Sequence, residues 1–150
     1  MMSGNNNEVP ATERSPRSPR WDLLGWYKVD KDHRRFIRRL RILQNPYFAI
    51  LLTRIYTDDT DRPPHNHSRP FWTMALSGSY TERVWPDPRD LGTSFIREHP
   101  RLRPVLVRQH EAHQIISIRG RLRTAVLAGR HHGTFYFWTP AGPVDWKQYR

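Results

Sequence analysis

The middle of the chain reads Arg62-Pro63-Pro64-His65-Asn66-His67, and Gly78 follows eleven residues after the second histidine. Histidines two apart in an extended segment place both imidazoles on one face, because strand side chains alternate with period two. Proline is tolerated at the first residue of a strand, so the two prolines fit a strand that begins near His65. We expect His113, from a distant strand, to complete a three-nitrogen metal site with His65 and His67.

Length and composition set the limits of the molecule. The chain has 150 residues, of which 37% are hydrophobic, which is enough for one compact domain. Its formal charge is +11 and its pI about 11.0, a balance that favours anionic partners such as nucleic acid or phosphorylated ligands. The absence of cysteine excludes disulfides, thiolate metal sites and cysteine nucleophiles.

Targeting and membrane signals are missing from the sequence. No apolar run reaches the ~18 residues that a membrane-spanning helix needs, and the N-terminus lacks the apolar region of a signal peptide. We therefore expect a cytoplasmic protein without a membrane partner.

The first part of the chain divides into a tail and a helix. Residues 1–20 contain a Ser/Pro/Arg-rich run with almost nothing to bury, which predicts a disordered basic tail ahead of one domain over residues 21–150. The spacing of Phe36, Ile37, Leu40 and Leu43 predicts an N-terminal helix over about 31–43. Its remaining face is rich in arginine.

After Pro46 the pattern changes to short apolar segments separated by Pro, Gly or charged turns. A Ser77-Gly78-Ser79 turn is expected to join two of them as a hairpin. Eight or so strands at this spacing indicate a mostly β sandwich or barrel. The expected strands cover residues 47–56, 71–76, 80–85, 94–97, 105–109, 114–119, 122–127 and 134–138.

Several short motifs together resemble a known family. The run His65-Asn66-His67 followed by Gly78 resembles the first motif of the cupin superfamily, and the segment 109–115 around His113 resembles its second motif. From about Tyr47 to Tyr149 the order and spacing are similar to those of small uncharacterised cupin-like proteins of bacteria and phages. The matching segments are His65–Ser68, Gly78–Tyr80, Glu111–His113, Tyr136–Trp138 and Trp146–Tyr149.

The resemblance implies a fold and a metal site. The fold would be one small cupin-like double-stranded β-helix, or jelly-roll barrel. Phe71 stands where cupins carry a glutamate ligand, which leaves a three-histidine site like that of thiol dioxygenase-like cupins. Imidazole ligands suit Fe, Zn, Ni or Mn, so the identity of the divalent ion stays open. Glu82, just beyond the glycine, is an alternative fourth ligand.

Other residues near these motifs have candidate roles. The sequence before the third histidine departs from the family pattern, because Arg108 and His110 replace the usual glycine and proline. His110 competes with His113, but residues three apart fall on opposite faces of a strand, so one alone joins the site. Glu111 shares the face of His113 and is expected either to accept a hydrogen bond from a ligand ring or to be a surface carboxylate.

Aromatic residues are candidates for the wall of a barrel cavity. Tyr80 would donate a proton or a hydrogen bond to a ligand there, and Trp72, Tyr136 and Trp138 are alternatives for the wall or for plain core.

Two classes of function follow. The first is a metal-binding cupin-like protein, either a small-molecule dioxygenase or a related metalloenzyme, with its ligand inside the barrel and Tyr80 and Glu111 as catalytic residues. The alternative is a non-enzymatic basic module that binds nucleic acid or another anion. A barrel whose metal serves stability alone is a third reading, and the resemblance also implies a homodimer.

Overall fold

The computed structural model describes residues 22–31 and 34–149, and this part of the chain contains strands and no helix. The predicted tail, residues 1–20, lies outside it. No helix long and apolar enough to span a bilayer is found among these residues. The strands are β1 (Asp22–Lys31), β2 (Arg34–Gln44), β3 (Ala49–Ile55), β4 (Phe71–Trp85), β5 (Phe95–His99), β6 (Pro104–Val107), β7 (Ala112–Ala128), β8 (Tyr136–Thr139) and β9 (Gly142–Asp145).

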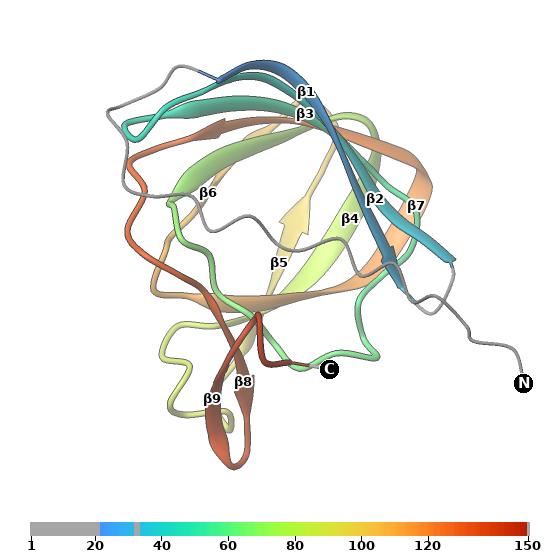
Figure 1. Cartoon of the computed structure of the whole chain (residues 1–150). Coiled ribbons are helices and arrows are strands. Elements are labelled where there is room, and N and C mark those ends of the chain that lie inside the picture. Colours follow the sequence, from blue (N-terminus) through green and yellow to red (C-terminus); the bar gives the residue numbers. More distant parts are fainter. Residues whose placement is uncertain (1–21, 32–33, 150) are drawn as a thin grey trace, which may run out of the picture.

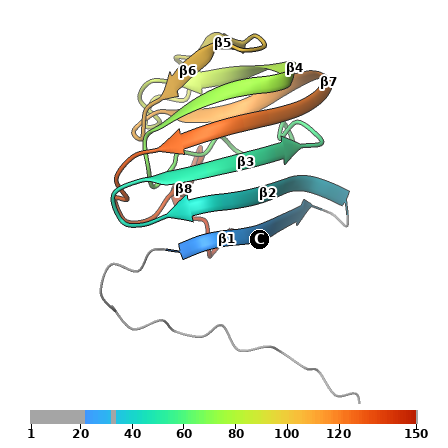
Figure 2. The ribbon, with the colours of Figure 1, turned by 90° about the horizontal axis from the view of Figure 1, so that it is seen from above.

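Seven strands form one antiparallel sheet in the order β1-β2-β3-β7-β4-β5, and β6 pairs with β4. Strands β1, β2, β3, β7 and β4 lie side by side in Figure 2. Figure 1 shows the sheet curving around an interior, while β8 and β9 form a separate hairpin beside it. The prediction of a mostly β barrel is confirmed.

The two longest strands, β4 and β7, pair along most of their length and bend at opposed glycines. Gly78 and Gly120 both have positive φ values, of 68° and 71°, and the register shifts between Ala75 and Ser79. A Cβ atom on Gly78 would lie 2.8 Å from the carbonyl oxygen of Arg119. Only glycine fits this conformation at this distance.

This bend corrects two predictions. The expected turn at residues 77–79 is a bulge within β4, so the predicted hairpin is wrong. The segments 114–119 and 122–127 are likewise one strand, because Gly120 bends β7 without ending it. The glycines were read correctly as special backbone positions and incorrectly as strand ends.

The predicted helix over 31–43 is also wrong, because Arg34–Gln44 forms β2. β2 pairs with β1 on one side and with β3 on the other, so its backbone groups are satisfied by two neighbours. Helical spacing of apolar residues is a weak local preference, and pairing with two neighbouring strands overrides it. Phe36, on the predicted apolar stripe, is buried in the strand.

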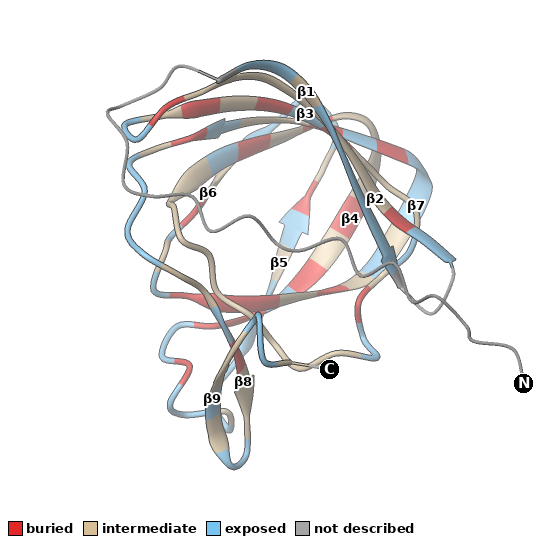
Figure 3. Cartoon of the chain, viewed as in Figure 1, coloured by how far each residue is buried: buried red, intermediate tan, exposed pale blue. Residues whose placement is uncertain are grey.

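Figure 3 shows the buried residues along the strands that enclose the interior, and these residues include polar as well as apolar side chains. One apolar cluster joins Ala75, Tyr80, Ile115 and Leu122, and a second joins Ala49, Leu51 and Ala128. Buried polar side chains share the same space, namely Thr53, Thr73, Thr124, Glu82, His99, Glu111 and His113. Buried polar groups need hydrogen-bond partners. The contacts among these side chains form the candidate site.

Candidate metal centre

The three predicted histidines meet inside the barrel. His65 and His67 lie in the connection between β3 and β4, and His113 is the second residue of β7. The backbone N–H of His65 donates to the carbonyl of His113 at 3.1 Å, and that of His113 donates back at 2.9 Å. The expected strand at His65 is therefore reduced to two isolated β-bridges, one to His113 and one to Phe137, and they hold three distant segments of the chain together.

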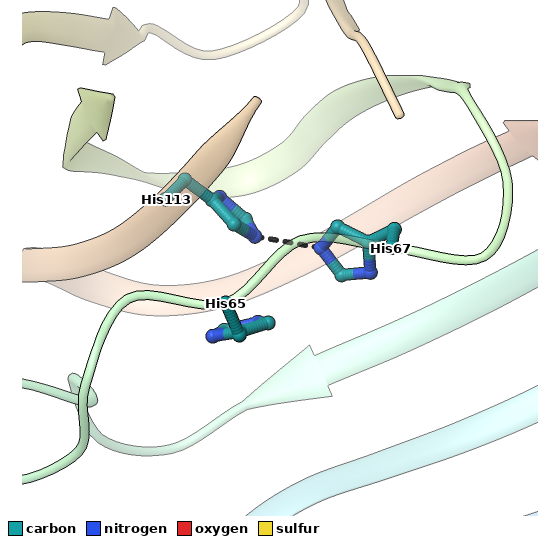
Figure 4. Close-up of side chains that lie close together, drawn as sticks. All are labelled: His65, His67 and His113. Atoms are coloured by element: carbon teal, nitrogen blue, oxygen red, sulfur yellow. Dashed lines mark hydrogen bonds between the residues drawn. The ribbon is translucent and has the colours of Figure 1, made fainter. Parts of the chain in front are cut away.

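The imidazoles face one another (Figure 4). Nε2 of His67 lies 2.6 Å from Nε2 of His113, and the ring centroids of His65 and His113 are 4.8 Å apart. One ring nitrogen from each of the three histidines lies within 4.8 Å of the other two. His110, the rival of His113, is exposed and outside this group.

The protonation states of His65 and His67 suit metal ligands. Burial, with the charge of His113 as the next cause, holds the pKa values of His65 and His67 well below the ordinary value, so both rings are neutral near pH 7. A neutral imidazole is the form that binds a metal ion. The buried Nδ1 of His65 makes no hydrogen bond with the described residues and lies 3.6 Å from Oδ2 of Asp59.

Glu82 contacts Nδ1 of His113, the ring nitrogen that does not face His67. Its Oε2 lies 2.5 Å from Nδ1 of His113, and its side chain is fully buried at 0% exposure. Burial by itself would raise the pKa of Glu82, but its hydrogen-bonded neighbours His113 and His99 hold that pKa well below the ordinary value. Conversely, Glu82 raises the pKa of His113 against the effect of burial. The carboxylate thus keeps a proton on Nδ1 and leaves Nε2 to face the other histidines.

The second oxygen of Glu82 is equally occupied. Oε1 accepts a hydrogen bond from Nε of Arg97 at 2.6 Å and lies 2.6 Å from Nε2 of His99. The alternative that Glu82 is a fourth metal ligand does not fit this arrangement. Its carboxylate contacts Nδ1 of His113, and Glu82 is not a member of the group of converging histidines.

Glu111 occupies a different place from the one expected. Its carboxylate accepts from Nη1 of Arg97 at 2.9 Å and lies 3.5 Å from Nη1 of Arg108. The residue that orients a histidine ring is Glu82. A local signal existed for Glu82, because it shares the inward face of β4 with Tyr80 and Val84, and a carboxylate at a buried position needs a cationic partner.

Tyr80 is buried and stacks on His99, with ring centroids 4.0 Å apart. Burial raises its pKa, and the charge of Glu82 raises it further. It therefore contacts the charge cluster behind His113, where its ring fixes His99. Of the other predicted wall residues, Trp72 is 50% exposed and points outward.

Aromatic rings cover the histidines. The ring of Phe71 lies 4.8 Å from that of His67, and the ring of Phe137 lies 5.6 Å from that of His65. Phe137 stacks in turn on Tyr149, and Phe135 stacks on Trp146. The C-terminal segment thus limits the access of water to the site. Sequence reasoning had matched Phe137, Trp146 and Tyr149 to family motifs without placing them over the histidines.

This donor set fits a divalent metal ion. Three imidazoles, two of them held neutral, leave the full charge of the ion in place and leave positions open for a ligand. Glu82 supplies the carboxylate contact that metal-binding histidines normally make with their second nitrogen.

Comparison with known proteins rests on structure alone, because no protein-family model and no curated protein matches the sequence. The Fe(II) form of HppE matches with a TM-score of 0.55 at 14% identity, over 83% of this chain and 64% of that one. HEPD of Streptomyces albus, solved with 2-hydroxyethylphosphonate and Fe(II), matches with a TM-score of 0.57 at 12% identity. The fold is a cupin-like β barrel.

HppE and HEPD are longer than this chain. The match to HEPD covers 72% of this chain and 24% of that one. Hydroxypropylphosphonic acid epoxidase from S. wedmorenis has a TM-score of 0.51 at 14% identity, with 71% of this chain and 55% of that chain covered. At such identities the likeness establishes the barrel, and the chemistry has to be argued from the residues.

Proposed function

We propose that this chain is a metalloenzyme that oxidises a small molecule inside its barrel, with a divalent metal ion held by His65, His67 and His113. The observation that carries this proposal is the convergence of three imidazoles from two separate segments. When bound, the metal supplies Lewis acidity and access to oxygen chemistry. HppE and HEPD, which share the fold, were solved with Fe(II), and this supports iron.

The residues around the site would orient and protect it. Glu82 fixes the ring of His113 and holds the proton on Nδ1. Phe71 and Phe137 lie against the two other histidines and reduce their contact with water, which strengthens electrostatic interactions within the site. Tyr80 and Glu111 act as positioning residues, because Tyr80 stacks on His99 and Glu111 binds Arg97.

Oxygen consumption tests this function. The protein is loaded with Fe(II) without air and mixed with a panel of small thiols, hydroxy acids and phosphonates in an oxygen electrode. We expect one class to give uptake above that of free iron, and the uptake to disappear in His67→Ala. Stoichiometric iron without uptake for any compound would contradict the oxidising role while leaving the metal site intact.

A second candidate function rests on the outer face of the sheet. Lys28, Arg38, Arg54 and Arg123 are directly opposite one another across β1, β2, β3 and β7. Strands lie about 4.8 Å apart, and like charges directly opposite are destabilising. In the described part of the chain Arg38 is the one member with an ion pair, to Asp30 at 2.6 Å. An anionic ligand would relieve this repulsion.

An apolar hollow lies beside this cationic row. It has a volume of ≈ 440 Å³ and is bordered by Leu40, Leu52 and Trp26, whose side chain is 73% exposed. Cations beside an exposed aromatic ring suit single-stranded nucleic acid, with phosphates on the cations and a base on the ring. We propose this as the ligand of the outer face.

Anisotropy of a fluorescent single-stranded oligonucleotide tests the outer face. We expect affinity to fall steeply between low salt and 0.2 M salt, and to fall further in Arg54→Gln/Arg123→Gln. The matched control, Arg89→Gln/Arg103→Gln, removes two exposed charges elsewhere and should bind as the wild type does. Equal losses of oligonucleotide affinity in both double variants would show that binding depends on net charge alone and not on the outer face.

A further inference from the structure

The β8–β9 hairpin contacts the barrel through the segment that carries two of the histidines. In the described part of the chain, β8 and β9 pair with each other and with no other strand. His65 makes one isolated bridge to His113 on β7 and another to Phe137 on β8. The histidine segment therefore lies between the barrel and the hairpin and joins the two.

Asn66, the residue between the two histidines, binds the hairpin at two points. Its backbone N–H donates to the carbonyl of Tyr136 at 3.2 Å, and its side-chain Oδ1 accepts from the N–H of Tyr136 at 2.7 Å. The N–H of Trp138 adds a third bond, to the carbonyl of Pro64 at 2.8 Å. The side-chain oxygen of Asn66 thus takes the place of a backbone carbonyl in a strand pair. It is the one member of these three bonds that a substitution can remove.

Tyr136 lies between two phenylalanines whose rings approach the histidines. The ring centroid of Phe135 lies 6.4 Å from that of His65 and 6.5 Å from that of His67. The ring centroid of Phe137 lies 5.6 Å from that of His65. The bonds at Tyr136 therefore hold both phenylalanine rings beside the histidines.

Metal binding and docking of the hairpin would act on the same residues. An ion bound to all three histidines would fix His65 and His67, and Asn66 lies between them. The hairpin would then dock on a segment that is already ordered, which lowers the entropy cost of docking. By linkage, docking raises the metal affinity by the same factor by which metal favours docking.

We infer that Asn66 is a positioning residue of the metal centre. Its side chain docks the β8–β9 hairpin on the histidine segment, and the docked hairpin tightens metal binding and covers the site with Phe135 and Phe137. The first part of this inference concerns the hairpin alone, and the second part rests on the metal site proposed above. Asn66 acts through the histidines on either side of it.

Competition for Zn(II) with a chromophoric chelator tests the second part. We expect Asn66→Ala to lose about 5- to 10-fold in Zn(II) affinity, which is the effect of one hydrogen bond. Asn66→Asp keeps an acceptor oxygen for the N–H of Tyr136 and should hold the affinity within about twofold of the wild type.

Thr139→Val is the matched control. It removes the hydrogen bond from Oγ1 of Thr139 to the carbonyl of Gly142, which lies within the hairpin at the opposite end of β8 from Tyr136. Its Zn(II) affinity should stay within about twofold of the wild type. Equal losses in Asn66→Ala and Thr139→Val, or an unchanged affinity in Asn66→Ala, overturn the role of Asn66 in metal binding.

Hydrogen exchange at the Tyr136 amide, followed by NMR, measures docking and needs no variant. Saturation of the wild type with Zn(II) should slow this exchange by about 5- to 10-fold, the same factor as the affinity loss in Asn66→Ala, because the coupling is reciprocal. An exchange rate that saturating Zn(II) leaves unchanged contradicts the coupling, whether or not the variants fold.

Metal-free protein separates this inference from the proposed function. If the wild type binds neither Zn(II) nor Fe(II), the metalloenzyme proposal fails and the coupling fails with it. Faster exchange at Tyr136 in metal-free Asn66→Ala than in the metal-free wild type would still support the docking role. Equal rates would overturn that role, even in a protein that binds its metal.

Discussion

Glu82 and His113 lie on adjacent strands, β4 and β7, and Oε2 of the glutamate is 2.5 Å from Nδ1 of the histidine. Through this contact the buried charge cluster behind the site fixes the ring that faces His65 and His67. The carboxylate also binds Arg97 and His99, so one side chain links the stability of the barrel to the geometry of the metal centre.

Glu82→Gln should weaken metal binding without removing a ligand. Loss of the charged acceptor from a metal-binding histidine typically reduces affinity by about 10- to 100-fold. Competition with a chromophoric chelator measures this change at a temperature where the variant is folded.

Two other carboxylates serve as controls for Glu82. Glu98→Gln changes an exposed residue on β5 and should alter neither stability nor metal affinity. Glu111→Gln weakens the contact with Arg97 and should lower stability while metal affinity stays within about twofold. A larger loss of metal in Glu111→Gln than in Glu82→Gln would reverse the roles assigned to these residues.

The histidines were predictable because their signals are local. His65 and His67 are two residues apart after a Pro-Pro pair, and His113 matched a short family motif. The role of Glu82 depends on the register of β4 against β7, in which Val84 is opposite His113. Register is fixed by long-range pairing, and no local pattern in the sequence encodes it.

The incorrect predictions have the same origin. The apolar spacing around Phe36 and Leu40 suits a helix. The segment is nevertheless a strand, because β2 pairs with a neighbouring strand on each of its two edges. Gly78 marks a position of positive φ, and sequence alone does not distinguish a turn from a bulge within a longer strand.

Gly78→Ala should destabilise the barrel. The substitution forces positive φ on alanine and places its Cβ 2.8 Å from the carbonyl of Arg119. Gly133→Ala is the matched control, because Gly133 has a φ of 74° and open space around it. We expect the free energy of unfolding to fall by about 1 kcal/mol in Gly133→Ala, from the backbone conformation alone, and by about 2–4 kcal/mol in Gly78→Ala. Denaturant unfolding measures both, and equal losses would show that the contact with Arg119 is relieved without cost.

Tyr80 should make the protein lose stability at high pH. Burial raises its pKa above the ordinary value near 10, so above that pH the unfolded chain releases a proton that the folded chain keeps. The unfolded state then binds fewer protons, and the free energy of unfolding falls as pH rises, by up to about 1.4 kcal/mol per pH unit for this group. Comparison of wild type with Tyr80→Phe between pH 9 and pH 11 isolates the effect. A wild-type curve parallel to that of the variant would place the hydroxyl in contact with water.

Metal stoichiometry tests the central claim most directly. Protein purified with Fe(II), Zn(II), Ni(II) or Mn(II) is dialysed and its metal content measured for the wild type, for His65→Ala/His67→Ala, for His113→Ala and for the exposed control His110→Ala. We expect about one ion per chain in the wild type and in the control, and almost none in the other two, as three-histidine coordination requires. A wild type without bound metal, or full metal content after loss of His65 and His67 together, would contradict the account.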